Sequence, residues 1–280
     1  PDETFELLVE DNGGLAVAWI GHVLARLAAG RSLLEPALRT ARALDRLSAQ
    51  SRAALRARLE KWPGTPVDKH LNSLKQLGVA ATPPSSSSGV RAIAAMLADA
   101  GGLLPRKAML SAIAHLEQSD RQALHRLKVR LGPLDVFLPP LLKPAAQYWR
   151  GALLAVRTNQ QMPGLPDAGA ATLSSDADPR GAALAYRRLG REWLRIDLAD
   201  RLASHARHVR SAGGADPVDA ALAPSFGLSE NALGRLMAEG GFTKAGGGWR
   251  WRGRRGGGTR RRPPTNHPVP APGKPKRPHG

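Results

Sequence analysis

The sequence predicts a mainly α-helical protein in which a small β-hairpin unit precedes helical accessory segments and a disordered basic tail. Apolar residues make up 42% of the chain, and aromatic residues only 4%, so leucine and alanine must fill the core. Both are strong helix formers, whereas aromatic and β-branched residues favour strands. Apolar positions also recur at helical spacing along most of the chain, which indicates helices that are amphipathic.

The first 30 residues form the exception and predict a small β unit. Phe5, Leu7 and Val9 alternate with Glu6 and Glu10, and the alternation continues over 15–19. Between them stands Asp-Asn-Gly-Gly, whose residues tolerate the positive φ angles of a tight turn. A third strand is expected over 23–27. Because a lone hairpin is marginal in water, we expect it to pack on the following helices or on a preceding domain.

Helices are predicted to begin after Gly30 and to fill residues 31–82. Seven arginines and lysines crowd this segment between Arg39 and Lys61, either as the wall of a basic groove or as a solvated face. A Pro/Ser linker follows at 83–89, because its residues cannot offset their ordering entropy by apolar burial. Residues 90–157 then form a second helical block.

The remainder divides into a loop over 158–181, a small C-terminal helical unit over 182–248 and the tail over 249–280. A helix resumes at about Ala182, although a short strand near 193–196 fits the pattern almost equally well. Ser229 is expected to cap the last helix, which Gly240-Gly241 ends, in a pattern that weakly resembles half of a helix-turn-helix. The tail is rich in Gly, Pro, Arg and Lys, and we expect it to be disordered.

Charge is concentrated in that tail. The chain carries a formal net charge of +18, and the residues from Trp249 onward hold ten Lys or Arg and no acid. Such a segment is typical of binding to a polyanion, with nucleic acid as the first candidate, and a solubilising tail as the alternative.

Two tryptophans stand at the head of the tail, in the sequence Trp-Arg-Trp-Arg at 249–252. Alternating indoles and guanidinium groups suit a single strand, since bases stack on the rings while cations meet phosphates. The competing interpretation is that one tryptophan caps the last hydrophobic unit and the other is incidental.

The sequence lacks the motifs of several common catalytic and metal-binding sites. The chain has no Cys, no G-x-x-x-x-G-K-[ST] phosphate loop and no G-x-S-x-G nucleophile motif, so we predict no catalytic residue and no metal site. The absence of Cys fits a reducing compartment. No apolar run is long enough to span a membrane, and the N-terminus has no signal-peptide character. We therefore expect a cytoplasmic protein without a membrane partner, and a fragment or processed product, because the first residue is Pro1.

The stretch from Leu124 to Arg157 organises the chain. A helix is expected to end at Gly132-Pro133, an extended apolar piece to follow over 134–138, and Pro139-Pro140 to break it before a second helix starts near Pro144. Phe137 and Leu138 are predicted to be buried at this corner and to lock the two helices together.

The same stretch resembles the C-terminal region of superfamily 2 RNA helicases of the mitochondrial degradasome type and their bacterial relatives. The matching residues are Leu127, Val129, Arg130, Gly132, Phe137, Leu138, Pro139, Leu141, Leu142, Lys143, Pro144 and Arg150. Lys128 departs from the family, which usually has Gly there, and Pro133 replaces a common basic residue. Weaker similarity covers 5–38, 55–77 and 226–242.

The resemblance implies the accessory region of an ATP-dependent RNA or DNA helicase, a hydrolase whose ATP- and Mg²⁺-binding motor domains lie outside this chain. Its expected partners are single-stranded RNA or DNA and those motor domains in cis, with a nuclease or ribosomal partner as a further option. The alternative is a helical protein–protein adaptor with a cationic tether. The residues predicted to bind nucleic acid are Lys128, Arg130, Lys143, Arg150, Trp249, Arg250, Trp251, Arg252, Arg254, Arg255, Arg260, Arg261 and Arg262.

Overall fold

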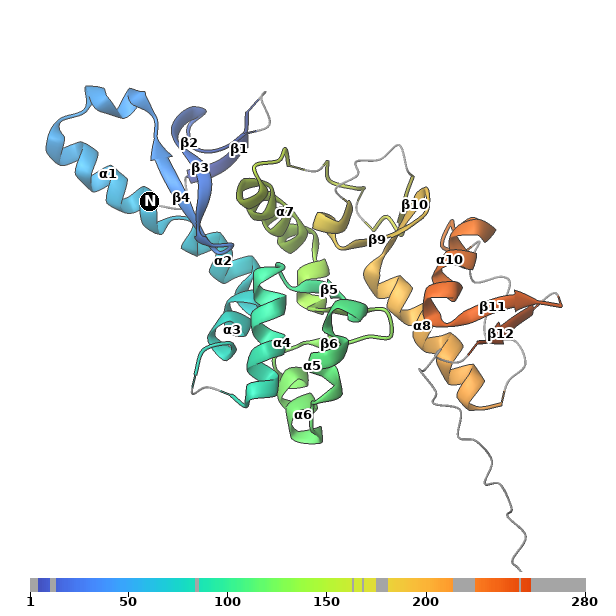
Figure 1. Cartoon of the computed structure of the whole chain (residues 1–280). Helices are drawn as coiled ribbons and strands as arrows, with labels where there is room; N and C mark the ends of the chain where they lie inside the picture. The colour runs from blue at the N-terminus through green and yellow to red at the C-terminus, as the bar shows by residue number, and fades with distance from the viewer. Residues whose placement is uncertain are drawn as a thin grey trace, which may run out of the picture.

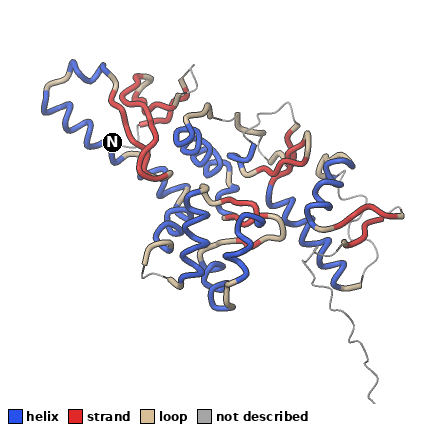
Figure 2. Tube along the Cα trace, in the orientation of Figure 1, coloured by secondary structure: helices blue, strands red, loops and turns tan. Residues whose placement is uncertain are grey.

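In a computed structural model, the protein mixes helices and strands along an elongated body (Figures 1 and 2). Residues 5–10, 14–83, 86–162, 164–167, 169–174, 181–213, 225–246 and 248–252 are described. Helices account for 51% and strands for 24% of residues, and the strands form four small antiparallel sheets. The expected mainly α class is therefore wrong. Alanine and leucine rank high as helix formers, but this propensity is worth less than about 1 kcal/mol per residue, so turn formation and strand pairing can override it here.

The N-terminal sheet is a meander of β1 (Phe5–Val9), β2 (Leu15–Trp19), β3 (His22–Ser32) and β4 (Glu35–Thr40). The predicted hairpin is confirmed, with Phe5 opposite Trp19 and Val9 opposite Leu15. Its predicted turn lies largely outside the described residues. The prediction that helices begin after Gly30 is wrong, because β3 and β4 continue the sheet to Thr40. A Cβ at Gly30 would lie 1.9 Å from the carbonyl oxygen of Glu35, so this close strand approach requires glycine.

A 3₁₀ turn, η2 (Arg42–Arg46), and helix α1 (Ala49–Lys61) follow the sheet. Leu59 and Trp62 pack into the sheet's own hydrophobic cluster beside Phe5. The ring of Trp62 also meets that of Trp149 at a centroid distance of 5.7 Å. This aromatic contact joins the N-terminal sheet to the central part of the molecule.

The central block holds the largest core cluster. Its elements are α2 (Gly64–His70), α3 (Asn72–Ala80), α4 (Ser88–Asp99), η3 (Arg106–Met109), α5 (Leu110–Ala114), α6 (Gln118–Arg126), η4 (Pro139–Leu142) and α7 (Pro144–Thr158). Three short strands also lie in it: β5 (Leu103–Pro105), β6 (Arg130–Leu131) and β7 (Asp135–Phe137), in the order β5-β7-β6. The expected Pro/Ser linker is only partly described, and its Ser87 caps α4 by accepting a hydrogen bond from the amide of Val90.

The corner between α6 and α7 agrees with the sequence in part. The prediction that the first helix ends at Gly132-Pro133 is wrong, because α6 ends at Arg126 and residues 130–131 form β6. The extended piece contains β7, the prolines open a 3₁₀ turn, and α7 starts at Pro144. Phe137 and Leu138 are buried, as predicted. However, Phe137 packs with Ala185 and Ile196 of the C-terminal unit and does not join α6 to α7. At Gly132, a Cβ would lie 2.1 Å from Oδ1 of Asp200 and 2.7 Å from the carbonyl oxygen of Asp135. Glycine is therefore needed where this corner meets the C-terminal unit.

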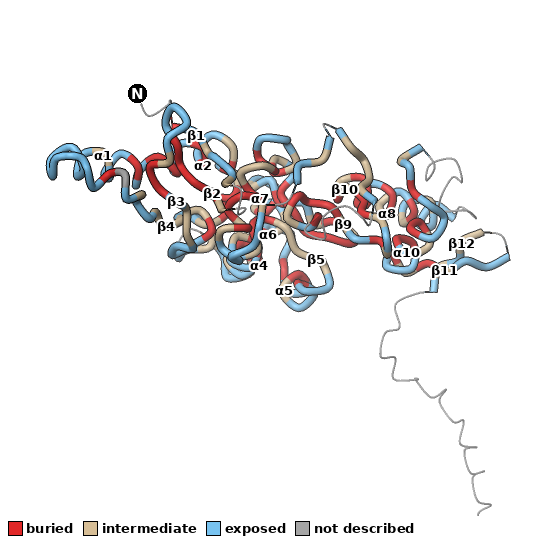
Figure 3. Tube along the Cα trace, turned by 90° about the horizontal axis from the view of Figure 1, so that it is seen from above, coloured by how far each residue is buried: buried red, intermediate tan, exposed pale blue. Residues whose placement is uncertain are grey.

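The C-terminal unit is less helical than the sequence indicates. It contains β8 (Thr172–Leu173), η5 (Gly181–Leu184), β9 (Tyr186–Leu189), β10 (Glu192–Arg195), α8 (Ile196–Ser211), α10 (Glu230–Gly240), β11 (Phe242–Ala245) and β12 (Gly248–Trp251). The expected helix from Ala182 is wrong, and the alternative with a strand near 193–196 is close to the truth. Gly190, at φ +76°, makes the turn that pairs β9 with β10. Seen from above, buried segments run through the middle of the molecule, while α1 is largely exposed (Figure 3).

Candidate nucleic-acid interface

Helix α10 and the β11–β12 hairpin form a compact helix–hairpin motif at the C-terminal end of the body (Figure 1). Ser229 caps α10, as predicted, by accepting a hydrogen bond from the amide of Ala232 at 3.2 Å. Glu192, the first residue of β10, fixes this cap, because its carboxylate accepts hydrogen bonds from both the amide and the hydroxyl of Ser229. Gly241, at φ +95°, then ends the helix and leads directly into β11.

The hairpin places its two tryptophans on one face. Phe242 lies opposite Trp251, and Lys244 opposite Trp249. Since side chains alternate along a strand, Trp249 and Trp251 point to the same side. Both pack as half-buried rings against the cluster that α8 and α10 form.

The two tryptophans have different surroundings. The guanidinium carbon of Arg210 lies 3.9 Å from the ring centroid of Trp251, and the ring of Phe242 meets it edge-on at 5.0 Å. Trp251 is therefore covered by its own chain and caps the unit. Trp249 lines an open cleft of about 780 Å³, where it approaches Gly234 of α10. Stacking on a base is consequently much easier at Trp249 than at Trp251.

This hairpin cleft lies between α10, the β9–β10 turn and the hairpin, and four cations line it: Arg191, Arg235, Lys244 and Arg252. Two acids also line it, but Glu192 is engaged with the cap of α10. Lys244 and Glu230 are 3.5 Å apart with side chains 63% and 91% exposed, so their attraction is heavily screened. Arg191 and Arg235 make no ion pair within the described residues. The cleft thus offers cations beside an accessible indole.

Sequence reasoning found only part of this cleft. Trp249 and Arg252 were predicted, whereas Arg191, Arg235 and Lys244 were not. The helical spacing of Asn231 and Arg235, four apart on the exposed face of α10, is the sequence signal that points to one of them. Arg191 lies in the β9–β10 turn, which the expected helix from Ala182 excludes and which the alternative strand near 193–196 does not specify.

The four corner residues predicted to bind nucleic acid do not line the hairpin cleft. Lys128 and Lys143 are exposed on the central block. Arg130 is also exposed, but pairs with the buried carboxylate of Asp200 at 3.0 Å, which ties β6 to α8. Of the hairpin residues, Arg250 is exposed on the face away from the tryptophans. Arg254, Arg255, Arg260, Arg261 and Arg262 lie outside the described residues.

Arg150 differs from the other predicted residues because it is only 3% exposed. Its guanidinium donates hydrogen bonds to the carbonyl oxygens of Gly101, Ala182 and Ala183. Burial lowers the pKa of Arg150 to about 10, so the side chain stays charged at neutral pH. This arginine holds α7 against the end of α4 and η5, and a strand on the surface would not reach it.

A polar network links the C-terminal unit to the central block. Arg187 of β9 pairs with Asp135 of β7 at 2.5 Å and also with Glu239 of α10. Burial raises the pKa of Asp135, and the attraction of Arg187 partly opposes this effect. The described residues contain no cluster of three or more His, Asp or Glu suited to a metal ion. Nor does any described helix have the length and apolar character to cross a membrane.

Comparisons of this chain with protein-family models, with curated proteins and with solved structures found no match.

Proposed function

We propose that this chain is the C-terminal accessory, nucleic-acid-binding region of an ATP-dependent RNA or DNA helicase, and that it binds single strands through the hairpin cleft and the adjoining basic tail. The observation that carries the proposal is the cleft itself, in which Trp249 stands among Arg191, Arg235 and Arg252. A sequence-tolerant site for single strands needs this combination of a stacking surface and cations that follow the phosphates.

The corner adds support for the helicase resemblance. Lys128, which stands where the family usually has Gly, adopts φ +63°, the left-handed conformation that glycine favours. A position whose backbone conformation favours glycine therefore coincides with the glycine of the family pattern. In this proposal ATP and Mg²⁺ act in motor domains elsewhere in the parent protein, and the present chain hydrolyses no ATP.

The test is a fluorescence-anisotropy titration with labelled single-stranded RNA and DNA at several salt concentrations. The tail should be removed after Arg252, because a cut at Trp249 would also delete β12 and unpair β11. Loss of the tail should weaken binding strongly at low salt. The logarithm of the binding constant falls linearly with the logarithm of the salt concentration. Each lost phosphate contact should make this negative slope less steep by about 0.7.

A double substitution, Arg191→Ala with Arg235→Ala, tests the cleft apart from the tail. We expect weaker binding and a slope reduced by roughly 1.4 for two lost phosphate contacts. Lys69→Ala with Arg126→Ala is the matched control, since it removes two exposed cations outside the cleft. If the truncated chain carrying the cleft substitutions binds as tightly as the intact chain, the proposed interface is wrong.

The adaptor function remains the second candidate, and one observation favours it. Four large apolar side chains of the N-terminal sheet and its β2–β3 turn are strongly exposed: Leu8, Val9, Trp19 and Ile20. Exposed apolar groups of this size suit a protein partner, including motor domains in cis. Apolar docking should hardly weaken with salt, whereas phosphate binding must. If no version of the chain binds nucleic acid, the adaptor becomes the better description.

A further inference from the structure

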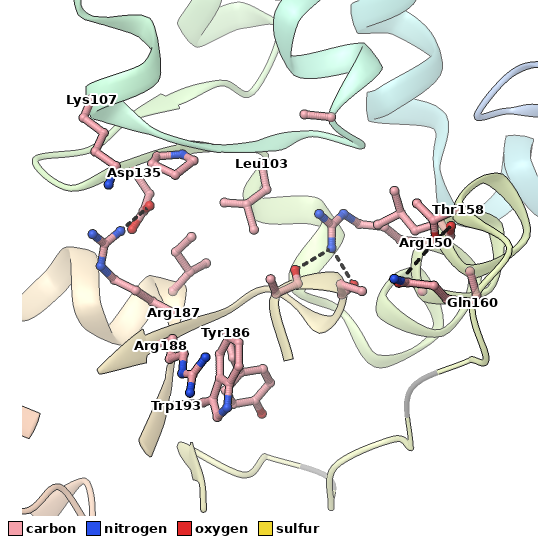
Figure 4. A pocket seen from close by; sticks show the side chains of 18 of the residues that line it. Leu103, Lys107, Asp135, Arg150, Thr158, Gln160, Tyr186, Arg187, Arg188 and Trp193 are labelled. Carbon is pink, nitrogen blue, oxygen red and sulfur yellow. Dashed lines mark hydrogen bonds and ion pairs between the residues drawn. The ribbon is translucent and has the colours of Figure 1, made fainter. Parts of the chain in front are cut away.

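A second cavity, of about 560 Å³, lies where β5 and α7 of the central block meet the β9–β10 hairpin (Figure 4). Leu103 of β5, Leu154 of α7 and Ile196 of α8 supply apolar wall, and Tyr186 and Trp193 add aromatic surface. Arg150 reaches into the wall from α7 (Figure 4). The size and the mainly apolar wall with a few polar groups are those of a small-molecule site.

Arg150 is the unusual group of this cavity, because it is a buried charge without a counter-ion. It is 3% exposed and forms no ion pair with any described carboxylate. Its hydrogen bonds run from Nε and Nη1 to three carbonyl oxygens, and Nη2 has no partner among the described residues. A buried cation is costly when no anion balances it. An anion in the cavity would supply both the missing charge and the missing acceptor.

The other charged groups at the cavity reinforce this preference. The lining carries two acids, Asp135 and Glu239, and both pair with the single cation Arg187. Lys107 has no acidic partner within the described part of the chain, and Arg188 lies over the ring of Trp193 at 5.9 Å. Arg150, Lys107 and Arg188 form no ion pair within the described residues. Together with Arg187 they make four cations against two acids, so the lining has a formal net charge of +2.

We propose that this cavity binds a small organic anion, with its phosphate or carboxylate group at Arg150 and its flat apolar body against Leu103, Ile196 and Trp193. The ligand must be small, because a side chain that is 3% exposed lies too deep for a continuous strand backbone. The site is separate from the hairpin cleft, and its existence does not depend on nucleic-acid binding.

The experiment measures binding to the intact chain by calorimetry and by thermal shift, with phenyl phosphate, benzoate, inorganic phosphate and benzyl alcohol as probes. Phenyl phosphate or benzoate should bind saturably at one site and raise the melting temperature. The better of the two identifies the anionic group. Inorganic phosphate and the neutral alcohol should bind at least tenfold more weakly. Equal binding of inorganic phosphate, or of the alcohol, would overturn the proposed ligand class.

Substitutions at the cavity distinguish binding in this cavity from nonspecific attraction of anions to a basic protein. Arg150 itself is left intact because it holds three carbonyl groups. Thr158→Trp should fill the mouth from the exposed end of α7 and abolish binding. Lys107→Ala should weaken binding roughly threefold to tenfold, and Lys107→Glu more. Lys61→Ala, which changes an exposed cation outside the cavity, should have no effect.

Lys107→Glu keeps the test decisive if Thr158→Trp lowers the melting temperature of the free protein. Binding of phenyl phosphate or benzoate that is unchanged by Lys107→Glu would refute the assignment to this cavity. So would the absence of saturable binding by both anions at millimolar concentration.

Discussion

Two regions combine cations with large apolar side chains: the corner between α6 and α7, and the β11–β12 hairpin. The corner buries these side chains, whereas the hairpin leaves them partly or fully exposed to solvent. At the corner, Phe137 and Leu138 are 4% and 1% exposed, and Arg150 points inward to carbonyl groups. At the hairpin, the tryptophans are half-buried, and Arg250 and Arg252 are exposed. The corner, which has the more specific sequence pattern, therefore contributes to core packing. The hairpin, whose pattern is less specific, places cations and aromatic rings at the surface.

This difference has a physical origin. A motif of Gly, Pro and buried apolar residues is demanding because backbone conformation and close packing tolerate few alternatives. A cationic surface for single strands needs only charge and an accessible ring, which many sequences supply. Specificity of a pattern thus indicates where the fold is constrained, and it does not locate the binding surface.

The largest expected effect is the loss of the corner's aromatic anchor. Phe137→Ala should lower the free energy of unfolding by about 3–5 kcal/mol, because it removes a buried ring and leaves a cavity. Urea unfolding measures the change. Val79→Ala is the control, since Val79 is 62% exposed and its loss should cost less than about 0.5 kcal/mol. Similar losses for both variants would mean that the corner is not a packed core.

Gly132→Ala should come next, with a loss of about 1–3 kcal/mol. The added methyl group would collide with the carboxylate of Asp200 and the carbonyl of Asp135. Gly78→Ala is a control of opposite sign, because Gly78 lies within α3 and a Cβ there meets nothing within 4 Å. That substitution should stabilise by about 0.5–1 kcal/mol. If Gly132→Ala and Gly78→Ala shift the melting temperature in the same direction, the predicted difference between the two positions is wrong.

The two tryptophans of the hairpin should separate stability from binding. Trp251→Ala should cost about 1–2 kcal/mol of stability, less than a fully buried ring, because it loses contacts with Arg210 and Phe242. Trp249→Ala should mainly weaken single-strand binding, by about 1–3 kcal/mol if a base stacks there. Paired melts and anisotropy titrations test both. A larger binding defect in Trp251→Ala would reverse the assignment.

The smallest expected effect concerns pH. Burial raises the pKa of Asp135 above its ordinary 3.8, so the folded state binds this proton more tightly than the unfolded state. Asp135 therefore lowers stability progressively as pH rises from its ordinary pKa through its raised value. Asp135→Asn removes the titrating group. We subtract the unfolding free energy of the parent from that of the variant, and this difference should increase as pH rises through this range. Each pKa unit corresponds to about 1.4 kcal/mol. Urea unfolding between about pH 4 and 7 checks the sign, and a decreasing difference would refute it.

By itself, the sequence determined the features that depend on local chemistry. The β1–β2 pairing follows from alternation around a turn-forming stretch, and α7 begins at Pro144 because proline fits the first turn of a helix. Ser229 caps α10 for the same local reason. Burial of Phe137 and Leu138 could be predicted because two prolines confine a short apolar run.

Tertiary structure alone decided the rest. Segments that contain alanine and leucine became β3 and β4, and residues after Ala182 became a hairpin. Pairing with neighbouring strands outweighs the helical propensity of these two residue types, which is less than about 1 kcal/mol per residue. The arginines were the hardest to place, since sequence shows their charge and not what faces it. Arg150 was drawn inside by three carbonyl groups, whereas Arg191 and Arg235 meet in a cleft only because a β-turn and a helix face are brought together.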